Sequence, residues 1–190
     1  TDPYSDYQID DPDGTITDGE EGAWKLELQS TLTAKIGNGN YDIGHLFANS
    51  GGGGGGDAGC IGCVCVNPSS GDPYGKGSAY TSPSNGIPEG DSFDIDFVTH
   101  EIGHQLGANH TFSHKIEGTG VSVEPGSGST IMGYAGITDY NVKNQSDSYF
   151  SYASIKQIQD NLATKSCPVS TILSNQTPTV SAGLNYTIPK

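Results

Sequence analysis

The segment HEIGHQLGANH at residues 100–110 constrains the chain more than any other part of its sequence. His100 and His104 are four residues apart, so on a helix their side chains lie on the same face, one turn apart. Apolar residues recur at intervals of four across the same stretch, and either Asp91 or Ser92 is suited to an N-cap. The sequence therefore predicts a helix that begins near residue 91 and offers two imidazoles to one metal ion.

A third histidine, His110, completes the pattern. A catalytic zinc ion takes three protein ligands and keeps one position open for water. His110 can be the third ligand only if the helix ends after Leu106 and the chain turns back, and Gly107 tolerates the left-handed backbone that such an end requires. We therefore predict a zinc site made of His100, His104 and His110, with Gly107 as the residue that ends the helix.

Glu101 lies beside the first histidine on the same turn of the predicted helix. A carboxylate there can take a proton from water activated by the metal and pass it to a leaving amine, without itself binding the metal. The alternative is a non-catalytic, zinc-stabilised binding module. Glu101 argues against it, because a structural site has no need of this carboxylate and usually closes with a fourth ligand. His45 and His114 lack ligand spacing and are expected to be ordinary polar residues.

The same segment is similar to the extended signature HExxHxxGxxH of the metzincin metallopeptidases, and STIMGYAG at residues 129–136 resembles their Met-turn. Within this clan, residues 41–167 look most like secreted bacterial relatives of the reprolysin-like (ADAM-like) peptidases. The resemblance implies an α+β metzincin fold, with a twisted sheet over the active-site helix, a Met-turn and a C-terminal helix. It also implies zinc-dependent hydrolysis of peptide bonds in peptides or exposed protein segments.

The resemblance also implies roles for particular residues. Met132, the single methionine of the chain, would form a hydrophobic floor under the three histidines. Tyr134 would either stabilise the oxyanion or serve as an aromatic wall of the cleft, and both interpretations stay open. Cys65 and Cys167 would form a disulfide that ties the end of the domain to its sheet. One departure is Thr111, which follows the third histidine as in pappalysin-like peptidases, where animal reprolysins have Asp.

The remaining cysteines leave several alternatives open. Cys60, Cys63 and Cys65 form a C-x-x-C-x-C cluster with no fourth thiolate nearby, so disulfides or buried thiols are favoured over a second metal site. If Cys65 pairs with Cys167, then Cys60 and Cys63 pair with each other, pair with an absent upstream segment, or stay reduced.

The other elements are predicted from periodicity and breaker residues. We expect an α-helix over Glu20–Ile36, a short strand within residues 41–48 and a mobile loop at the six glycines Gly51–Gly56. A buried strand is expected over residues 60–66, followed by an edge strand at Gly77–Thr81 that binds extended substrate. The last expected element is a helix over Ser151–Lys165 with Ile155, Ile158 and Leu162 on one face.

The composition restricts the partners and the compartment. The net charge of −14 repels nucleic acids and anionic membranes, and no stretch approaches the ~20 consecutive apolar residues of a membrane span. Four cysteines in an acidic, glycine-rich chain favour an oxidising compartment, so we expect a secreted protein. The spacing of Asp11, Asp13 and Asp18 loosely resembles a calcium loop, but the closing Glu is out of register, and a solvated loop is the alternative.

The expected organisation is a catalytic domain over residues 1–168 and a linker over residues 169–190 that leads toward a further module. The strand, helix and strand with which reprolysin-like domains usually open are not found before the first predicted helix. The chain begins at Thr1 without an initiator Met. We therefore expect a processed product of a secreted zymogen, whose partners are its peptide substrates and an upstream fragment of the same precursor.

Overall fold

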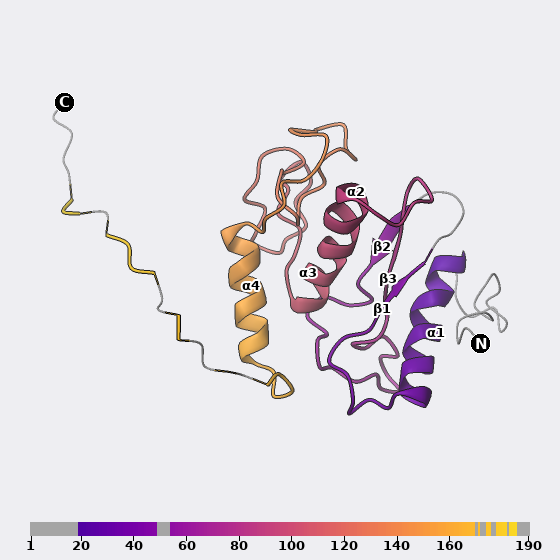
Figure 1. Ribbon diagram of the computed structural model, residues 1–190. Helices are drawn as coiled ribbons and strands as arrows, with labels where there is room; N and C mark the ends of the chain where they lie inside the picture. The colour runs from indigo at the N-terminus through magenta and orange to yellow at the C-terminus, as the bar shows by residue number, and fades with distance from the viewer. Residues whose placement is uncertain are drawn as a thin grey trace.

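The computed structural model describes residues 19–48 and 54–169 and, in the C-terminal tail, residues 171, 174–175, 178–181 and 183–185. In Figure 1 the first helix lies on one side of a small sheet, the helix with the histidine motif on the other side, and the last helix beyond it. This arrangement confirms the predicted α+β class. The elements meet where the zinc site is expected, between the sheet and the loops before the last helix.

The sheet has three short strands in the order β1-β3-β2, and these are β1 (His45–Phe47), β2 (Gly55–Asp57) and β3 (Ala79–Ser82). β1 pairs with β3 in parallel, and β2 pairs with β3 in antiparallel fashion. The prediction of an edge strand at Gly77–Thr81 is therefore wrong, because β3 is hydrogen-bonded on both sides and all four of its residues are buried. The described strand at the antiparallel edge is β2.

The prediction of a loop over the whole glycine run is wrong at its end, because the last two glycines belong to β2. Gly56 shows why glycine suits a strand here. A Cβ atom added to Gly56 would lie 2.4 Å from Cγ of Glu101, so the strand passes the histidine helix more closely than a side chain would allow. Residues 49–53 lie outside the described residues.

The buried strand predicted over residues 60–66 is also wrong, because this segment forms consecutive turns. A disulfide joins Cys60 to Cys63, and the backbone of Cys65 has a φ of 65°, which is incompatible with an extended strand. Val64 is the buried side chain of the segment. The apolar pattern therefore reflects one turn that packs inward.

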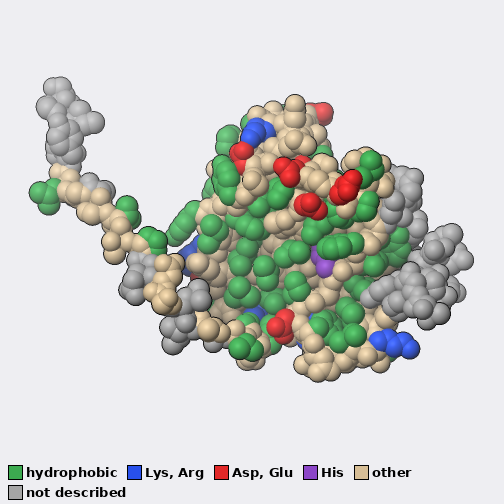
Figure 2. Space-filling view, in the orientation of Figure 1, with side chains coloured by type: hydrophobic (Ala, Val, Ile, Leu, Met, Phe, Trp, Pro, Cys, Tyr) green, Lys and Arg blue, Asp and Glu red, His purple; other side chains and the backbone are tan. Residues whose placement is uncertain are grey.

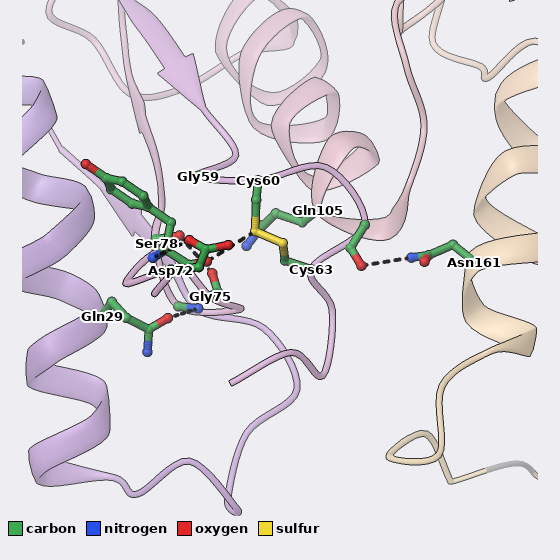
Figure 3. The surroundings of a disulfide bond; sticks show 12 residues. Gln29, Gly59, Cys60, Cys63, Asp72, Gly75, Ser78, Gln105 and Asn161 are labelled. Atoms are coloured by element: carbon green, nitrogen blue, oxygen red, sulfur yellow. Dashed lines mark hydrogen bonds between the residues drawn. A yellow bond between two sulfur atoms is a disulfide. The ribbon is translucent and has the colours of Figure 1, made fainter. Parts of the chain in front are cut away.

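This cysteine turn caps the C-terminal end of the histidine helix. The backbone N–H of Gly62 donates to the carbonyl of His104 at 2.8 Å, and the N–H of Val64 donates to the carbonyl of Gln105 at 3.1 Å. Figure 3 shows the disulfide beside Gln105, with Asn161 of the last helix reaching toward the same turn. The turn thus satisfies carbonyl groups that a helix end leaves without intrahelical partners.

The first helix, α1 (Gly19–Lys35), confirms the prediction to within one residue at each end. Trp24 and Leu28 are buried as its periodicity indicated, and the Trp24 ring meets the Tyr80 ring of β3 edge-on with centroids 5.5 Å apart. Ile36 follows the end of the helix and is exposed. The contact between Trp24 and Tyr80 fixes α1 against the sheet.

The histidine helix is built from three consecutive segments, α2 (Asp91–Phe93), the π-helix η1 (Asp94–Thr99) and α3 (His100–Leu106). Its start confirms the predicted position near residue 91. The N-cap is Gly90, however, and neither of the two predicted residues caps the helix with a side chain. The π-helical segment was not expected. A single π-helical stretch inside a helix often marks a functional site, and this one directly precedes the first histidine.

The last helix, α4 (Tyr152–Ala163), lies within the predicted range and has Ser151 as its N-cap, whose side chain accepts a hydrogen bond from the N–H of Ser154. Its inward face differs from the prediction. Ser154 is buried and Ile158 packs against the core, whereas Ile155 is 43% exposed. The small Ser154 lets the helix approach its neighbours closely.

Beyond α4, the described residues of the tail form no helix or strand. The predicted domain boundary at residue 168 stays a prediction, and the proposed calcium loop at residues 11–18 lies outside the described residues. Within the described part of the chain, none of the helices has the length and apolar character needed to cross a membrane.

Candidate metal centre

The Nε2 atoms of the three motif histidines converge. Nε2 of His104 lies 3.1 Å from Nε2 of His100 and 3.0 Å from Nε2 of His110. His100 and His104 stand on consecutive turns of α3, and His110 comes from the loop that follows. Their ligand atoms all lie within 4.8 Å of one another, so this cluster can hold a metal ion.

The end of α3 brings the third histidine back to the other two. Gly107 has left-handed backbone angles of φ 119° and ψ 3°, and the N–H of Ala108 returns to the carbonyl of Gly103 at 2.9 Å. A Cβ atom at Gly107 would also lie 2.7 Å from Cβ of Asn161 in α4. Both the backbone conformation and the packing therefore require glycine where the chain reverses.

The second nitrogen of each ring has its own acceptor. Nδ1 of His100 is 2.6 Å from the carbonyl oxygen of Ile131, and Nδ1 of His104 is 2.7 Å from that of Ala108. A carbonyl oxygen can only accept, so both Nδ1 atoms carry the proton and both Nε2 atoms present a lone pair. These two backbone carbonyls thus set the orientation of the two helical ligands.

The loop histidine is held in a different way. Nδ1 of His110 is 2.9 Å from Oε2 of Glu117, a half-buried carboxylate in the loop after α3. A carboxylate that accepts from Nδ1 sets the tautomer and makes the imidazole a stronger ligand. Nε2 of His110 therefore also presents a lone pair to the common point.

This donor set fits zinc. Nε2 of His104 lies about 3 Å from each of the other two Nε2 atoms, and no hydrogen bond relieves the repulsion of their lone pairs because the protons are on Nδ1. Tetrahedral zinc with Zn–N bonds of about 2.05 Å would place neighbouring nitrogens about 3.3 Å apart. Burial and the neighbouring imidazole of His110 lower the pKa of His104 to about 4, and burial also lowers the pKa of His100 and His110. The rings are therefore neutral, as metal ligands must be.

Glu101 directly follows His100 and is buried where α3 faces β2. Burial, together with the charge of Asp57, raises the pKa of Glu101 to about 8, although a backbone hydrogen bond from Ala58 acts in the opposite direction. Asp57 is itself paired with Lys25 of α1, whose Nζ lies 2.7 Å from Oδ2. The edge strand and α1 thus determine the electrostatic surroundings of the candidate base.

Two cavities open beside the histidines, and Tyr134 lines both. One of about 520 Å³ lies between β2, the histidine helix and the loop 133–146, and the other, of about 720 Å³, lies against the loop after His110. The Tyr134 ring centroid is 4.5 Å from that of His110 and 5.8 Å from that of His100. On the face of the molecule that Figure 2 shows, acidic side chains gather in the upper part, around α2 and the loops before α4.

Met132 is fully buried and packs against α3 at Gly103, where an added Cβ atom would lie 2.6 Å from the methionine sulfur. It forms a core cluster with Ala108 and Ile131, and Phe150 and Ile158 pack against this cluster. The carbonyl of Met132 accepts from the N–H of Thr111 at 3.0 Å. The methionine segment is thereby joined to both the helix and the third-ligand loop.

The other candidate residues lie apart from this cluster. Cys65 is bonded to Cys167, and Cys60 to Cys63, so these thiolates are not available for a second metal site. His45 bridges the sheet and α3 through hydrogen bonds to Gln105 and Thr81, and His114 bonds the carbonyl of Gly126. Both histidines have the ordinary polar role expected for them.

Three carboxylates near the histidines could not be found from the sequence. Asp57 follows the glycine run, and Glu117 and Glu124 lie 7 and 14 residues after the third histidine, in loops without periodicity. Acidic residues are frequent in this chain, so nothing in the sequence distinguishes these three from the others. Only the path of the loops brings them to the site.

Three converging neutral histidines on an α+β scaffold define a protein with a candidate zinc centre. A sequence model described as metallo-peptidase family M12B, reprolysin-like, matches residues 3–166. The match covers most of the chain, so the chain belongs to this family, which implies a zinc hydrolase that acts on peptides or proteins. Comparison with curated proteins and with solved structures gave no match.

Proposed function

We propose that this protein is a secreted zinc-dependent endopeptidase in which His100, His104 and His110 hold the metal and Glu101 is the general base. The observation that carries the proposal is the convergence of three Nε2 atoms while each Nδ1 is occupied. Membership of the M12B family and two disulfides, which are consistent with an extracellular protein, support it.

Zinc, when bound, supplies a Lewis acid that polarises a carbonyl group and makes water more acidic. Glu101 follows the first ligand and lines the 520 Å³ cavity. We propose that its carboxylate takes the proton of the attacking water and delivers it to the nitrogen of the leaving amine. A purely structural zinc site would have no need of a carboxylate that lines this cavity.

The substrate is proposed to lie along β2 instead of along Gly77–Thr81. One side of β2 pairs with β3, and its residues Gly55 and Gly56 line the same cavity as His100 and Glu101. An extended peptide added to a strand edge forms backbone hydrogen bonds that do not depend on its sequence. Glycines at this edge let the peptide backbone approach the base closely.

Two further residues take proposed roles beside the metal. Met132 would form the Met-turn floor, because it is fully buried against α3 and its neighbour Ile131 orients His100. Tyr134 would either approach the oxyanion or form a wall of the cleft. Its ring contacts with two of the ligands and its place in both cavities are compatible with either role.

The decisive experiment is Glu101→Gln, with metal content and peptide hydrolysis measured on the same preparation. We expect about one zinc per chain in both proteins and a loss of several orders of magnitude in kcat/KM for the variant. A chelator should abolish hydrolysis by the parent, and added zinc should restore it. A parent without zinc, or a variant that cleaves at the parent rate, would show that the proposed mechanism is wrong.

A further inference from the structure

We propose that Glu124 is a positioning residue of the metal centre, whose carboxylate fastens the chain after His110 to the segment that orients His100. The inference rests on the proposed zinc site and concerns how that site is held together. Glu124 lies in the loop between α3 and α4, 14 residues after the third histidine. It does not contact the imidazoles, so it would act through its neighbours.

The Glu124 carboxylate accepts four hydrogen bonds. Oε1 accepts from the backbone N–H of Ser129 at 3.0 Å and of Thr130 at 3.1 Å. Oε2 accepts from the hydroxyl of Thr130 at 2.6 Å and from the hydroxyl of Thr111. A carboxylate has about four lone-pair sites, so its acceptor capacity is filled by two segments of chain.

One of these segments follows a ligand directly, and the other contains the carbonyl that orients a ligand. Thr111 directly follows His110, and its backbone is also bonded to Glu124, whose N–H donates to the Thr111 carbonyl at 2.9 Å. Thr130 directly precedes Ile131, whose carbonyl accepts from Nδ1 of His100 at 2.6 Å. Glu124 therefore connects the loop ligand to the carbonyl that orients the first helical ligand.

The surroundings indicate that the hydrogen bonds of Glu124 are an integral part of the folded loop. The hydroxyl groups of Thr111 and Thr130 belong to buried residues, and a buried hydroxyl needs an acceptor. Although burial raises the pKa of Glu124, the hydrogen bonds from the two threonines and from the backbone lower it overall, so the carboxylate is ionised. Gly128, with a φ of 72°, turns the chain toward the carboxylate, and an added Cβ atom there would lie 3.2 Å from Oε2.

This contact also gives a physical reason for Thr111, which stands where animal reprolysins have Asp. An acidic side chain at this position would face the Glu124 carboxylate at hydrogen-bond distance and repel it. A threonine instead supplies the donor that Glu124 requires. Thr111 and Glu124 are thus complementary, and the proposal treats them as a pair.

The test compares Glu124→Gln, Thr111→Val and the double variant with the parent, and uses the exposed Glu89→Gln as a matched control. The amide of Glu124→Gln keeps the shape and still accepts from the two backbone N–H groups, but its NH₂ group faces two hydroxyl donors. Zinc Kd is measured by competition with a chromophoric chelator. The visible spectrum of the Co²⁺-substituted protein reports the geometry of the ligands.

We expect Glu124→Gln to weaken zinc binding by about 10-fold, at the lower end of the effect of outer-shell groups, and to change the Co²⁺ spectrum. Thr111→Val should have a smaller effect in the same direction. The double variant should bind zinc as Glu124→Gln does, because the two changes remove the same contact. Glu89→Gln should bind like the parent. The increase in Tm caused by zinc should also be smaller in Glu124→Gln than in the parent.

A zinc Kd for Glu124→Gln within about twofold of the parent, with an unchanged Co²⁺ spectrum, would overturn the inference. So would an equal loss of Tm with and without zinc, which is what a purely structural role predicts. If Glu124→Gln does not fold, Thr111→Val, which keeps the carboxylate, decides by the same two measurements. A parent that binds no zinc would refute the proposed function itself, a result distinct from a parent that binds zinc and variants that match it.

Discussion

The two helical histidines and the loop histidine are held by different kinds of group. Backbone carbonyls of Ile131 and Ala108 orient His100 and His104, whereas a side-chain carboxylate, that of Glu117, orients His110. Substitutions cannot remove a backbone carbonyl, but they can remove a carboxylate. In the helical half of the site, the acceptors of the two histidines are therefore kept whatever side chains stand at Ile131 and Ala108, whereas in the loop half the acceptor of the histidine depends on the Glu117 side chain.

The supports of the two halves differ in the same way. At the end of α3, the cysteine turn bonds the carbonyls of His104 and Gln105 through its backbone N–H groups, and a disulfide closes that turn. Around His110, no helix or strand is present between Ala108 and Ser151 in the described structure. Side-chain contacts replace regular structure there, and Glu124 is the clearest of them.

A substitution at Gly107, where the helical half of the site joins the loop half, should have the largest effect on stability. Gly107→Ala forces a Cβ atom into a left-handed position and to within 2.7 Å of the Asn161 Cβ, so we expect a loss of about 2–3 kcal/mol in the free energy of unfolding. Chemical denaturation measures it. The matched control is Gly39→Ala, where an added Cβ meets nothing within 4 Å. Equal stability of the two variants would show that the helix end does not need glycine.

A smaller effect should follow in the loop half from Glu117→Gln. The amide keeps an acceptor for Nδ1 of His110 but loses the charge, so zinc Kd should rise about 10-fold, or about 1.4 kcal/mol. Glu89→Gln, an exposed carboxylate, is the control in the same competition assay. If Glu117→Gln binds zinc as tightly as the parent, His110 is held as robustly as the helical pair and the comparison fails.

The same division explains what could be predicted from the sequence. The helix, its end at Gly107 and the spacing of its two histidines follow from local rules of backbone geometry, so the pattern at residues 100–110 was sufficient to expect them. The start of α4 at its Ser151 cap was predictable for the same reason. Local rules act over a few residues, which is the range that a sequence pattern records.

The misplaced elements depend on contacts between distant segments. The run at residues 60–66 has the apolar pattern of a strand, yet it turns because it caps α3. At Gly56, Glu101 of the histidine helix leaves no room for a side chain, so glycine suits this strand position. The partners Glu117 and Glu124 are brought in by loops of irregular path. None of these contacts has a fixed spacing, so no periodicity could indicate them.

The smallest effect expected concerns pH and again involves the loop half. The pKa of Glu124 in the folded protein lies below its ordinary value of 4.5, because hydrogen bonds from Thr111 and Thr130 and from the backbone outweigh the effect of burial. A lowered folded-state pKa means that the stabilisation is complete above about pH 4.5 and is lost as the pH falls through the folded pKa. Solvent screening of this half-buried group limits it to less than about 1 kcal/mol.

The measurement is the free energy of unfolding of the parent and of Glu124→Gln, in the presence of a chelator, from about pH 7 to about pH 3. The parent should be the more stable protein near neutrality, and the difference should shrink as the pH falls below 4.5. Thr111→Val removes one of the hydrogen bonds, so its difference from the parent should shrink over the same range but by less. A parent advantage that grows as the pH falls would mean that the Glu124 carboxylate is not stabilised by these donors, and the loop half would then need another support.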